Sequence, residues 1–265
     1  MTAGIPRFQA VSVSPDIPAL AGRGRVHSVF ASTVNLAFPE GSWAVLLPAE
    51  KGNGPGFILL FDPPGDFRDW DLAPGAPVEM GKAELRLGKM VVTWDGAKVW
   101  TPGKPTRGEF SSLAASLAPF LPSPEGLVEK AVTERANRLK KELAAPGKAL
   151  ARLLGAGPGL TPAGDDFVVG LLAGLSGAGK AASGKRLAEA VLELLGERPG
   201  RTTDLSRHFL TAAARGIFCE FFLDFTRAAS GGGEAAVHQA RRVLGFGASS
   251  GAWLLRGFLA GCSGV

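Results

Sequence analysis

The chain has little cysteine and no long apolar segment, and both shortages restrict what it can be. Its 265 residues include only two cysteines, Cys219 and Cys262, and neither belongs to a CxxC pair. This excludes a disulfide framework and a cysteine-based structural zinc site, so we expect a reducing compartment. The longest apolar run, residues 167–178, is interrupted by glycines and is shorter than the roughly 20 residues that span a bilayer. Residues 1–10 have no apolar core of a signal peptide, and we expect a cytoplasmic protein without membrane contact.

The chain also lacks a strong excess of one charge. It has 29 Lys and Arg against 24 Asp and Glu, a net charge of +5. This balance suits a protein that handles small anions and is too weak to indicate nucleic acid. The hydrophobic content of 46% is enough for a sizeable core and excludes disorder of the whole chain. His27 and His238 have no partner at ligand spacing, so we interpret both as structural and predict no metal site built on histidine.

Residues up to about 110 have the patterns of β-strands. Short apolar or alternating runs bounded by Gly and Pro predict strands at residues 43–47, 57–61, 83–87, 90–94 and 97–100. Asp95-Gly96 between two such runs predicts a two-residue hairpin. We therefore predict a mostly antiparallel β-rich module over residues 1–115.

The remaining residues have helical patterns. Apolar residues at helical spacing predict helices at 124–145, 162–178, 183–196, 204–229, 234–244 and 252–262. Ser123-Pro124 supplies an N-cap and a first-turn proline for the first of these, and Pro146 should end it. The predicted fold class is α+β, with an all-helical domain over residues 116–265.

The most unusual run is the glycine-rich stretch at residues 155–166, GAGPGLTPAGDD. It ends in a helix start, with Thr161 as the expected N-cap and Pro162 at the first position. Glycines before a helix N-terminus let backbone N–H groups turn toward an anion, which the helix dipole also favours. The alternative is that these residues only form a tight, well-capped turn.

Helical geometry separates the two carboxylates of this motif. Asp166 shares a face with small residues through Gly177, which predicts that this face packs against the backbone of another helix or loop. Asp165 lies about 100° around the helix, so it should cap or brace the loop. We assign the catalytic role to Asp166, which either orients a donor such as a substrate amide or holds Mg²⁺ against a phosphate. The sequence leaves both open, and no cofactor is assigned.

The starts of the helices near residues 162, 204 and 252 should meet at one cavity, because each offers glycine, hydroxyl or free N–H groups. The candidate ligand-binding residues are Gly155, Gly157, Gly159, Thr161, Gly164, Asp165, Thr203, Ser249 and Ser250.

Residues 174–181, GLSGAGKA, almost match a phosphate-binding loop. Ala181 stands where the motif needs Ser or Thr, and the preceding residues have a helical pattern instead of that of a strand. We interpret this stretch as a helix end followed by a loop.

The Gly159–Asp166 octapeptide resembles the GLTPSGDD signature of the AllH-like family. Further segments agree, namely GRVHSVF at 24–30, VNL at 34–36, GPG at 54–56 and SSG at 249–251. This sequence has Ala163 in place of the signature serine. It has Ala248 and Trp253 where the family pattern commonly has a histidine and an acidic residue.

The resemblance implies a subunit associated with oxamate carbamoyltransferase in allantoin breakdown. That reaction interconverts oxalurate and phosphate with oxamate and carbamoyl phosphate. It implies partner subunits, an oligomer and a small anionic substrate. Three functions remain open: a transferase subunit that binds the anion at the glycine-rich loop, a non-catalytic assembly subunit, and a P-loop-like nucleotide enzyme.

Overall fold

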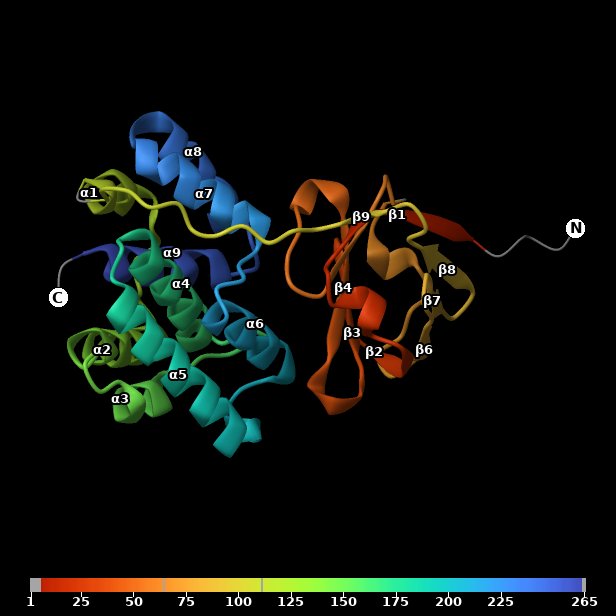
Figure 1. Ribbon diagram of the computed structural model, residues 1–265, viewed down its shortest axis with the longest axis horizontal. Coiled ribbons are helices and arrows are strands. Elements are labelled where there is room, and N and C mark those ends of the chain that lie inside the picture. Colours follow the sequence, from red (N-terminus) through yellow and green to blue (C-terminus); the bar gives the residue numbers. More distant parts are fainter. Residues whose placement is uncertain (1–5, 64, 111, 264–265) are drawn as a thin grey trace, which may run out of the picture. The chain divides into compact units, whose positions relative to one another are not determined.

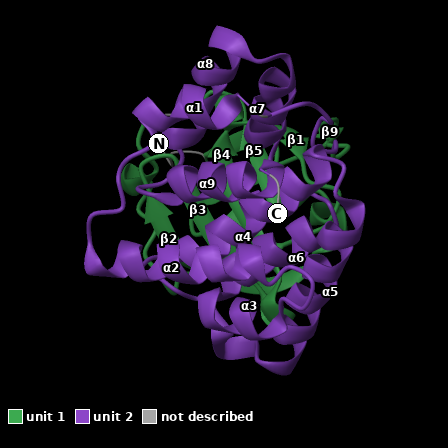
Figure 2. Cartoon of the chain, turned by 90° about the vertical axis from the view of Figure 1, so that its left-hand side faces the viewer, with its two compact units in different colours: residues 1–102 green, residues 103–265 purple. Residues whose placement is uncertain are grey.

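The computed structural model describes residues 6–63, 65–110 and 112–263 and divides the chain into two compact units (Figure 1). Unit 1 comprises residues 1–102 and unit 2 comprises residues 103–265, green and purple in Figure 2. Sequence patterns place the boundary at residues 115 and 116, whereas the contacts assign residues 103–115 to unit 2. None of the helices in the described part of the chain combines the length and apolar character that crossing a membrane requires.

Unit 1 is a closed β-barrel. Its strands follow the order β5-β4-β3-β2-β6-β7-β8-β1, and pairing of β1 with β5 closes the sheet. Apolar side chains such as Leu36, Ile58 and Leu85 are fully buried in the barrel core. The strands are β1 (Arg7–Val13), β2 (Gly22–Phe30), β3 (Thr33–Ala37), β4 (Trp43–Pro48), β5 (Phe57–Leu60), β6 (Pro77–Met80), β7 (Glu84–Leu87), β8 (Met90–Thr93) and β9 (Lys98–Val99).

Most neighbouring strands of the barrel are antiparallel, as predicted, but the predicted hairpin at Asp95-Gly96 is wrong. Both β8 and β9 pair in parallel with β1, so the two strands run in the same direction. Arg7 pairs with Val91 and Ser12 pairs with Lys98. The stretch between β8 and β9 is therefore two residues longer than the part of β1 that it runs beside. Gly96 does have a positive φ of 76°. The Asp-Gly signal therefore marks a local bend, and the tertiary position of β1 decides the pairing.

Unit 2 is helical, and no strand occurs among its described residues. This confirms the α+β fold class, with a β module at the N-terminal side and helices after it. The helices are α1 (Leu113–Leu117), α2 (Leu127–Lys141), α3 (Gly147–Leu153), α4 (Ala163–Gly177), α5 (Ala181–Glu197), α6 (Asp204–Ala214), α7 (Glu220–Gly231), α8 (Gly233–Leu244) and α9 (Ser250–Cys262). Short 3-10 turns lie at Ile17–Ala19, Pro39–Gly41, Ala49–Lys51, Phe67–Asp69, Ala118–Phe120 and Pro199–Arg201.

Several predicted helix ends are wrong, each for a local reason. The helix predicted at residues 204–229 is divided into α6 and α7, because Gly216 adopts a left-handed φ of 80°. The first predicted helix begins at Leu127 and not near Ser123, and its start is closed by Glu129, whose carboxylate accepts the Gly126 N–H at 2.6 Å. Helices α1 and α3 were not predicted.

Helices α4 and α9 pack with their backbones in contact, side by side in both views of unit 2 (Figures 1 and 2). A Cβ atom on Gly170 would lie 2.0 Å from the Leu254 carbonyl oxygen, and one on Gly257 would lie 2.0 Å from that of Phe167. The predicted backbone contact of the small-residue face is therefore present, and its partner is α9. Because this face is covered within the chain, it is not a free surface for docking another subunit.

Candidate functional site

The starts of α4, α6 and α9 converge in unit 2. The Thr161 and Ser250 hydroxyl oxygens lie 2.8 Å apart and join the loop before α4 to the first residue of α9. The Thr203 hydroxyl donates to the Leu160 carbonyl and joins the N-cap of α6 to the same loop. Three segments separated in sequence thus meet at the glycine-rich stretch. Two cavities that the structure describes in unit 2 are lined by other residues.

The glycines of this stretch differ in the structural requirement that each one meets. Gly155, Gly157 and Gly159 all have positive φ, at 73°, 117° and 96°. A Cβ on Gly155 would lie 2.2 Å from the Arg201 carbonyl oxygen, and one on Gly164 would lie 2.1 Å from that of Leu153. Nothing lies within 4 Å of the Cβ position of Gly159. Packing therefore explains Gly155 and Gly164, whereas Gly159 borders open space.

Backbone donors at the start of α4 are largely used inside the protein. The Gly164 N–H donates to the Ala156 carbonyl at 2.8 Å, and the Asp165 and Asp166 N–H groups donate to that of Pro162. In the described residues, the N–H groups of Gly159, Leu160 and Thr161 have no acceptor. Free donors thus lie in the loop just before the helix.

Asp165 braces this architecture. Its side chain is buried, and its carboxylate accepts hydrogen bonds from the Gly155 N–H at 2.7 Å, from the Ser206 hydroxyl at 2.7 Å and from the Thr202 hydroxyl. The acceptor thus joins the glycine-rich loop to the start of α6. This geometry matches the bracing interpretation.

Asp166 points elsewhere and is less well satisfied. The residue is only 8% exposed, and its Oδ2 atom has no hydrogen-bond partner among the described residues. Burial raises the pKa of Asp166 well above the usual value of 3.8, and the Asp165 carboxyl raises it further. Interaction with the nearby Ser250 and Thr161 hydroxyls opposes that shift. Burial also raises the pKa of Asp165, but its three donors oppose the rise.

The predicted N-cap at Thr161 is wrong. Pro162 occupies the N-cap position and α4 begins at Ala163, because the Thr161 hydroxyl is turned toward Ser250. Thr203, in contrast, does cap α6, and its hydroxyl accepts the Ser206 N–H at 3.1 Å. Ser249 is the exposed N-cap of α9 and makes no side-chain cap bond. Of the two serines, Ser250 is therefore the one that contacts the loop before α4.

Arg207 of α6 was not among the predicted ligand-binding residues, but it directly follows Ser206, whose hydroxyl contacts Asp165. It lies four residues after Thr203 on α6, so the two side chains share a face. The side chain of Arg207 is partly buried, and its Nε has no partner among the described residues. In the sequence, Arg207 stands out as a cation one helical turn after Thr203, the threonine that caps α6.

The near match to a phosphate-binding loop at residues 174–181 has another structure. Helix α4 precedes it where that motif needs a strand. The Lys180 ammonium donates to the carbonyl oxygens of Gly261 at 3.0 Å and Ser263 at 2.6 Å. Lys180 thus neutralises the C-terminal end of α9 and is not directed at a nucleotide.

Metal and thiol chemistry have little support in the described part of the chain. No group of three or more His, Cys, Asp or Glu side chains there is placed to hold a metal ion. Burial raises the pKa of both Cys219 and Cys262 to about 12, so neither thiol is a ready nucleophile.

Unit 1 contains a polar cluster that the sequence did not predict. His27 Nδ1 lies 3.2 Å from the Ser28 hydroxyl, which also accepts from the buried Asn35 amide at 3.0 Å. The register of β2 and β3 shifts between Val26 and Ser28, which allows adjacent side chains to meet. His27 also packs edge-on against Trp43, in agreement with a structural histidine.

Comparison with protein families gives two matches. Residues 153–262 match the model described as oxamate carbamoyltransferase subunit AllH. Residues 9–99 match the AllH family N-terminal domain. Together these ranges cover most of the chain, including the whole convergence of α4, α6 and α9. No curated protein and no solved structure matches the chain.

Proposed function

The chain belongs to the AllH family, and from this we propose that it is the carbamoyltransferase subunit that holds a small anionic ligand beside Asp166. The family description makes it a carbamoyltransferase-associated subunit, which implies partner subunits. The proposal adds a ligand site in unit 2 and a place in purine or allantoin nitrogen catabolism.

The observation that carries the proposal is the unpaired Asp166 Oδ2. A buried polar atom without a partner costs free energy, and most native structures avoid it. Here the atom lies in a carboxyl group that interacts with two hydroxyls, those of Thr161 and Ser250. A ligand that hydrogen-bonds to this oxygen would remove the cost. This favours a binding role over a turn that is only well capped.

The raised pKa of Asp166 favours an amide partner over Mg²⁺. A raised pKa means that the surroundings disfavour the charged form of this carboxyl group, which makes it a poorer ligand for a divalent cation. The unpaired Oδ2 can accept an amide N–H. Oxamate and oxalurate both offer amide N–H groups.

Positive charge for the ligand would come from the loop and from α6. The N–H groups of Gly159, Leu160 and Thr161 are free donors, and Arg207 is the nearest cation along the face of α6 that carries Thr203. Preorganised donors of this kind stabilise the charge that develops on a carbamoyl oxygen during transfer. In this scheme Asp166 fixes the amide, and the loop and Arg207 bind the anionic end.

Asp166→Asn in the complete complex tests the role of the residue. Asparagine keeps the size of the side chain but replaces one of its two acceptor oxygens with an NH2 group that only donates, so a ligand N–H loses its acceptor. We expect carbamoyl transfer or ligand affinity to fall by at least about tenfold, ~1.4 kcal/mol, while the melting temperature changes by only a few degrees. Asp204→Asn is the matched control, because Asp204 is exposed on the first turn of α6.

Calorimetry of the isolated chain with carbamoyl phosphate, oxamate and ATP separates the competing functions. Binding of oxamate or carbamoyl phosphate that is lost in Asp166→Asn supports the proposal. Binding of ATP alone would return the nucleotide enzyme to consideration. No binding, together with full activity of the variant complex, would leave a non-catalytic assembly role.

A further inference from the structure

A cavity of about 320 Å³ lies in unit 2 at the C-terminal end of α4. Its lining comes from residues 104–107, the end of α4, the start of α5 and the end of α6. The charged residues among the lining are all cationic, namely Lys104, Arg107, Lys185 and Arg215. We call it the basic cavity. An all-cationic lining is unexpected in a protein whose charges are nearly balanced.

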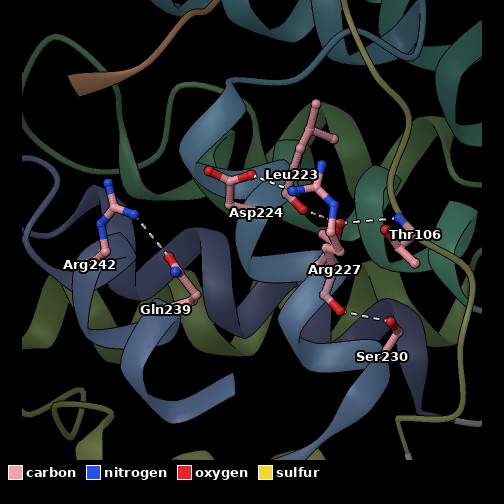
Figure 3. A network of polar contacts seen from close by, with 8 residues as sticks. Thr106, Leu223, Asp224, Arg227, Ser230, Gln239 and Arg242 are labelled. Carbon is pink, nitrogen blue, oxygen red and sulfur yellow. Dashed lines mark hydrogen bonds and ion pairs between the residues drawn. The ribbon is translucent and has the colours of Figure 1, made fainter. Parts of the chain in front are cut away.

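The extended segment that carries Lys104 and Arg107 is fixed onto the helices. The Thr106 N–H donates to the Thr226 hydroxyl of α7 at 3.1 Å, a contact drawn in Figure 3. The Gly108 N–H donates to the Gly177 carbonyl at the end of α4 at 3.2 Å. Arg107 therefore has an anchored residue on each side, and Lys104 lies two residues before the first anchor.

These cations are poorly compensated by the protein. In the described residues, no carboxylate forms an ion pair with Lys104, Arg107 or Arg215. Lys185 has one partner, the exposed Glu189 at 3.8 Å, and a pair of that kind is weak. Four like charges around one concavity repel one another, and a bound anion would relieve that repulsion.

The start of α5 adds donors to the same cavity. Its first turn contains no acidic residue, and its N-cap, Lys180, makes no side-chain cap bond. The Lys180 ammonium is instead bound to the end of α9. The positive end of the α5 dipole, at Ala181, thus borders the basic cavity without a carboxylate to neutralise it.

We propose that the basic cavity binds the phosphate group of a small molecule. A multiply charged, tetrahedral anion can engage several cations from different elements at once, whereas a single carboxylate needs only one or two. The concave shape favours a small molecule over nucleic acid, which needs a continuous basic stripe. The site is separate from Asp166, which is not among its lining residues; the α4 residues that line it, Leu172 and Ser176, lie about 9 Å and about 15 Å from Asp166 along the helix. It does not depend on the proposed function.

Titration calorimetry of the full chain with inorganic phosphate at low salt tests this site, with glycerol phosphate as the ester probe. The test variant is Lys104→Gln/Arg107→Gln, and Lys130→Gln/Lys141→Gln is the control, which removes the same charge from exposed positions of α2. We expect phosphate or ester affinity to fall at least about tenfold in the test variant and less than about twofold in the control. Binding should also weaken as salt is raised.

The comparison of probes identifies the source of the phosphate. Tighter binding of the ester indicates a phosphorylated metabolite, and tighter binding of phosphate indicates the free ion. Both outcomes support the site. No binding of either probe up to about 10 mM, or equal losses in both double variants, would overturn it. Loss of phosphate binding in Asp166→Asn with none in Lys104→Gln/Arg107→Gln would also overturn it, since the phosphate would then lie at the other end of α4.

Discussion

The two ends of α4 differ in the sign of their charged groups and in how deeply these groups are buried. The N-terminal end buries two carboxyl groups and surrounds them with hydroxyls and backbone donors, and both carboxyl pKa values are raised. The C-terminal end is bordered by exposed cations around the basic cavity. The same helix thus has buried carboxyl groups at one end and exposed cations at the other.

The helix dipole explains only part of this difference. Carboxylates in the first turn and cations near the last turn both complement the dipole. Burial has the larger effect at Asp166, because desolvation is the first cause of its raised pKa. Position along a helix thus determines which sign of charge is favoured, and tertiary packing determines whether the ionised form is favoured there.

The largest effect is expected from a substitution that disturbs the packing of α4 against α9, on which both ends of α4 depend. In Gly257→Ala, the new Cβ would lie 2.0 Å from the Phe167 carbonyl oxygen, and neither backbone can move easily. We expect unit 2 to lose about 4 kcal/mol or more of unfolding free energy, measured by denaturation followed by helical circular dichroism.

Gly196→Ala is the control for that substitution. It adds the same methyl group inside α5, where nothing lies within 4 Å. It should stabilise the helix by about 0.5–1 kcal/mol. A similar loss in both variants would mean that α4 and α9 are not in close backbone contact.

Asp165→Ala should damage the N-terminal end alone. It leaves the Gly155 N–H and the Thr202 and Ser206 hydroxyls without their acceptor. We expect a loss of about 3 kcal/mol in unfolding free energy, from the cost of unpaired buried donors. Phosphate binding at the basic cavity of the folded variant, measured by calorimetry, should stay unchanged. A parallel loss of phosphate binding would contradict the independence of the two ends.

The third prediction concerns pH. The folded-state pKa of Asp166 is raised above 3.8, so its stabilising contribution is complete below that pH and is lost as pH rises through the folded pKa. Asp166→Asn has no such loss. The melting temperature of the variant minus that of the wild type, measured from about pH 4 to pH 7, should therefore increase as pH rises. Curves that stay parallel would show that the Asp166 pKa is ordinary.

The smallest expected effect distinguishes the adjacent serines. Ser250→Ala removes the 2.8 Å contact with the Thr161 hydroxyl and should cost about 1 kcal/mol of unfolding free energy. Ser249→Ala removes an exposed hydroxyl without a cap bond and should change stability by less than about 0.5 kcal/mol. Thermal denaturation of the two variants measures the difference. Equal effects would show that the Ser250 contact with Thr161 does not contribute to stability.

Local patterns predicted much of the fold. Alternating and apolar runs predicted strands near β4, β5, β7 and β8, and helical spacing predicted the positions of α4, α5, α8 and α9 to within a few residues. Geometry around one helix separated Asp165 from Asp166 correctly, because the rotation per residue is a property of the backbone alone. The errors lie where long-range contacts decide, as at Asp95-Gly96 and at the Thr161 N-cap.

The sequence by itself determined the fold class, the helix that carries the two carboxylates and the direction in which each points. These follow from periodicity and glycine placement, which act over a few residues. Only the tertiary structure decided that β9 follows β8 along β1, that α9 covers the glycine face of α4, and that Lys180 binds the end of α9. It also decided that Asp166 is buried and that four cations border one cavity. Burial and charge clustering depend on residues distant in the chain, and no local pattern records which of them will meet.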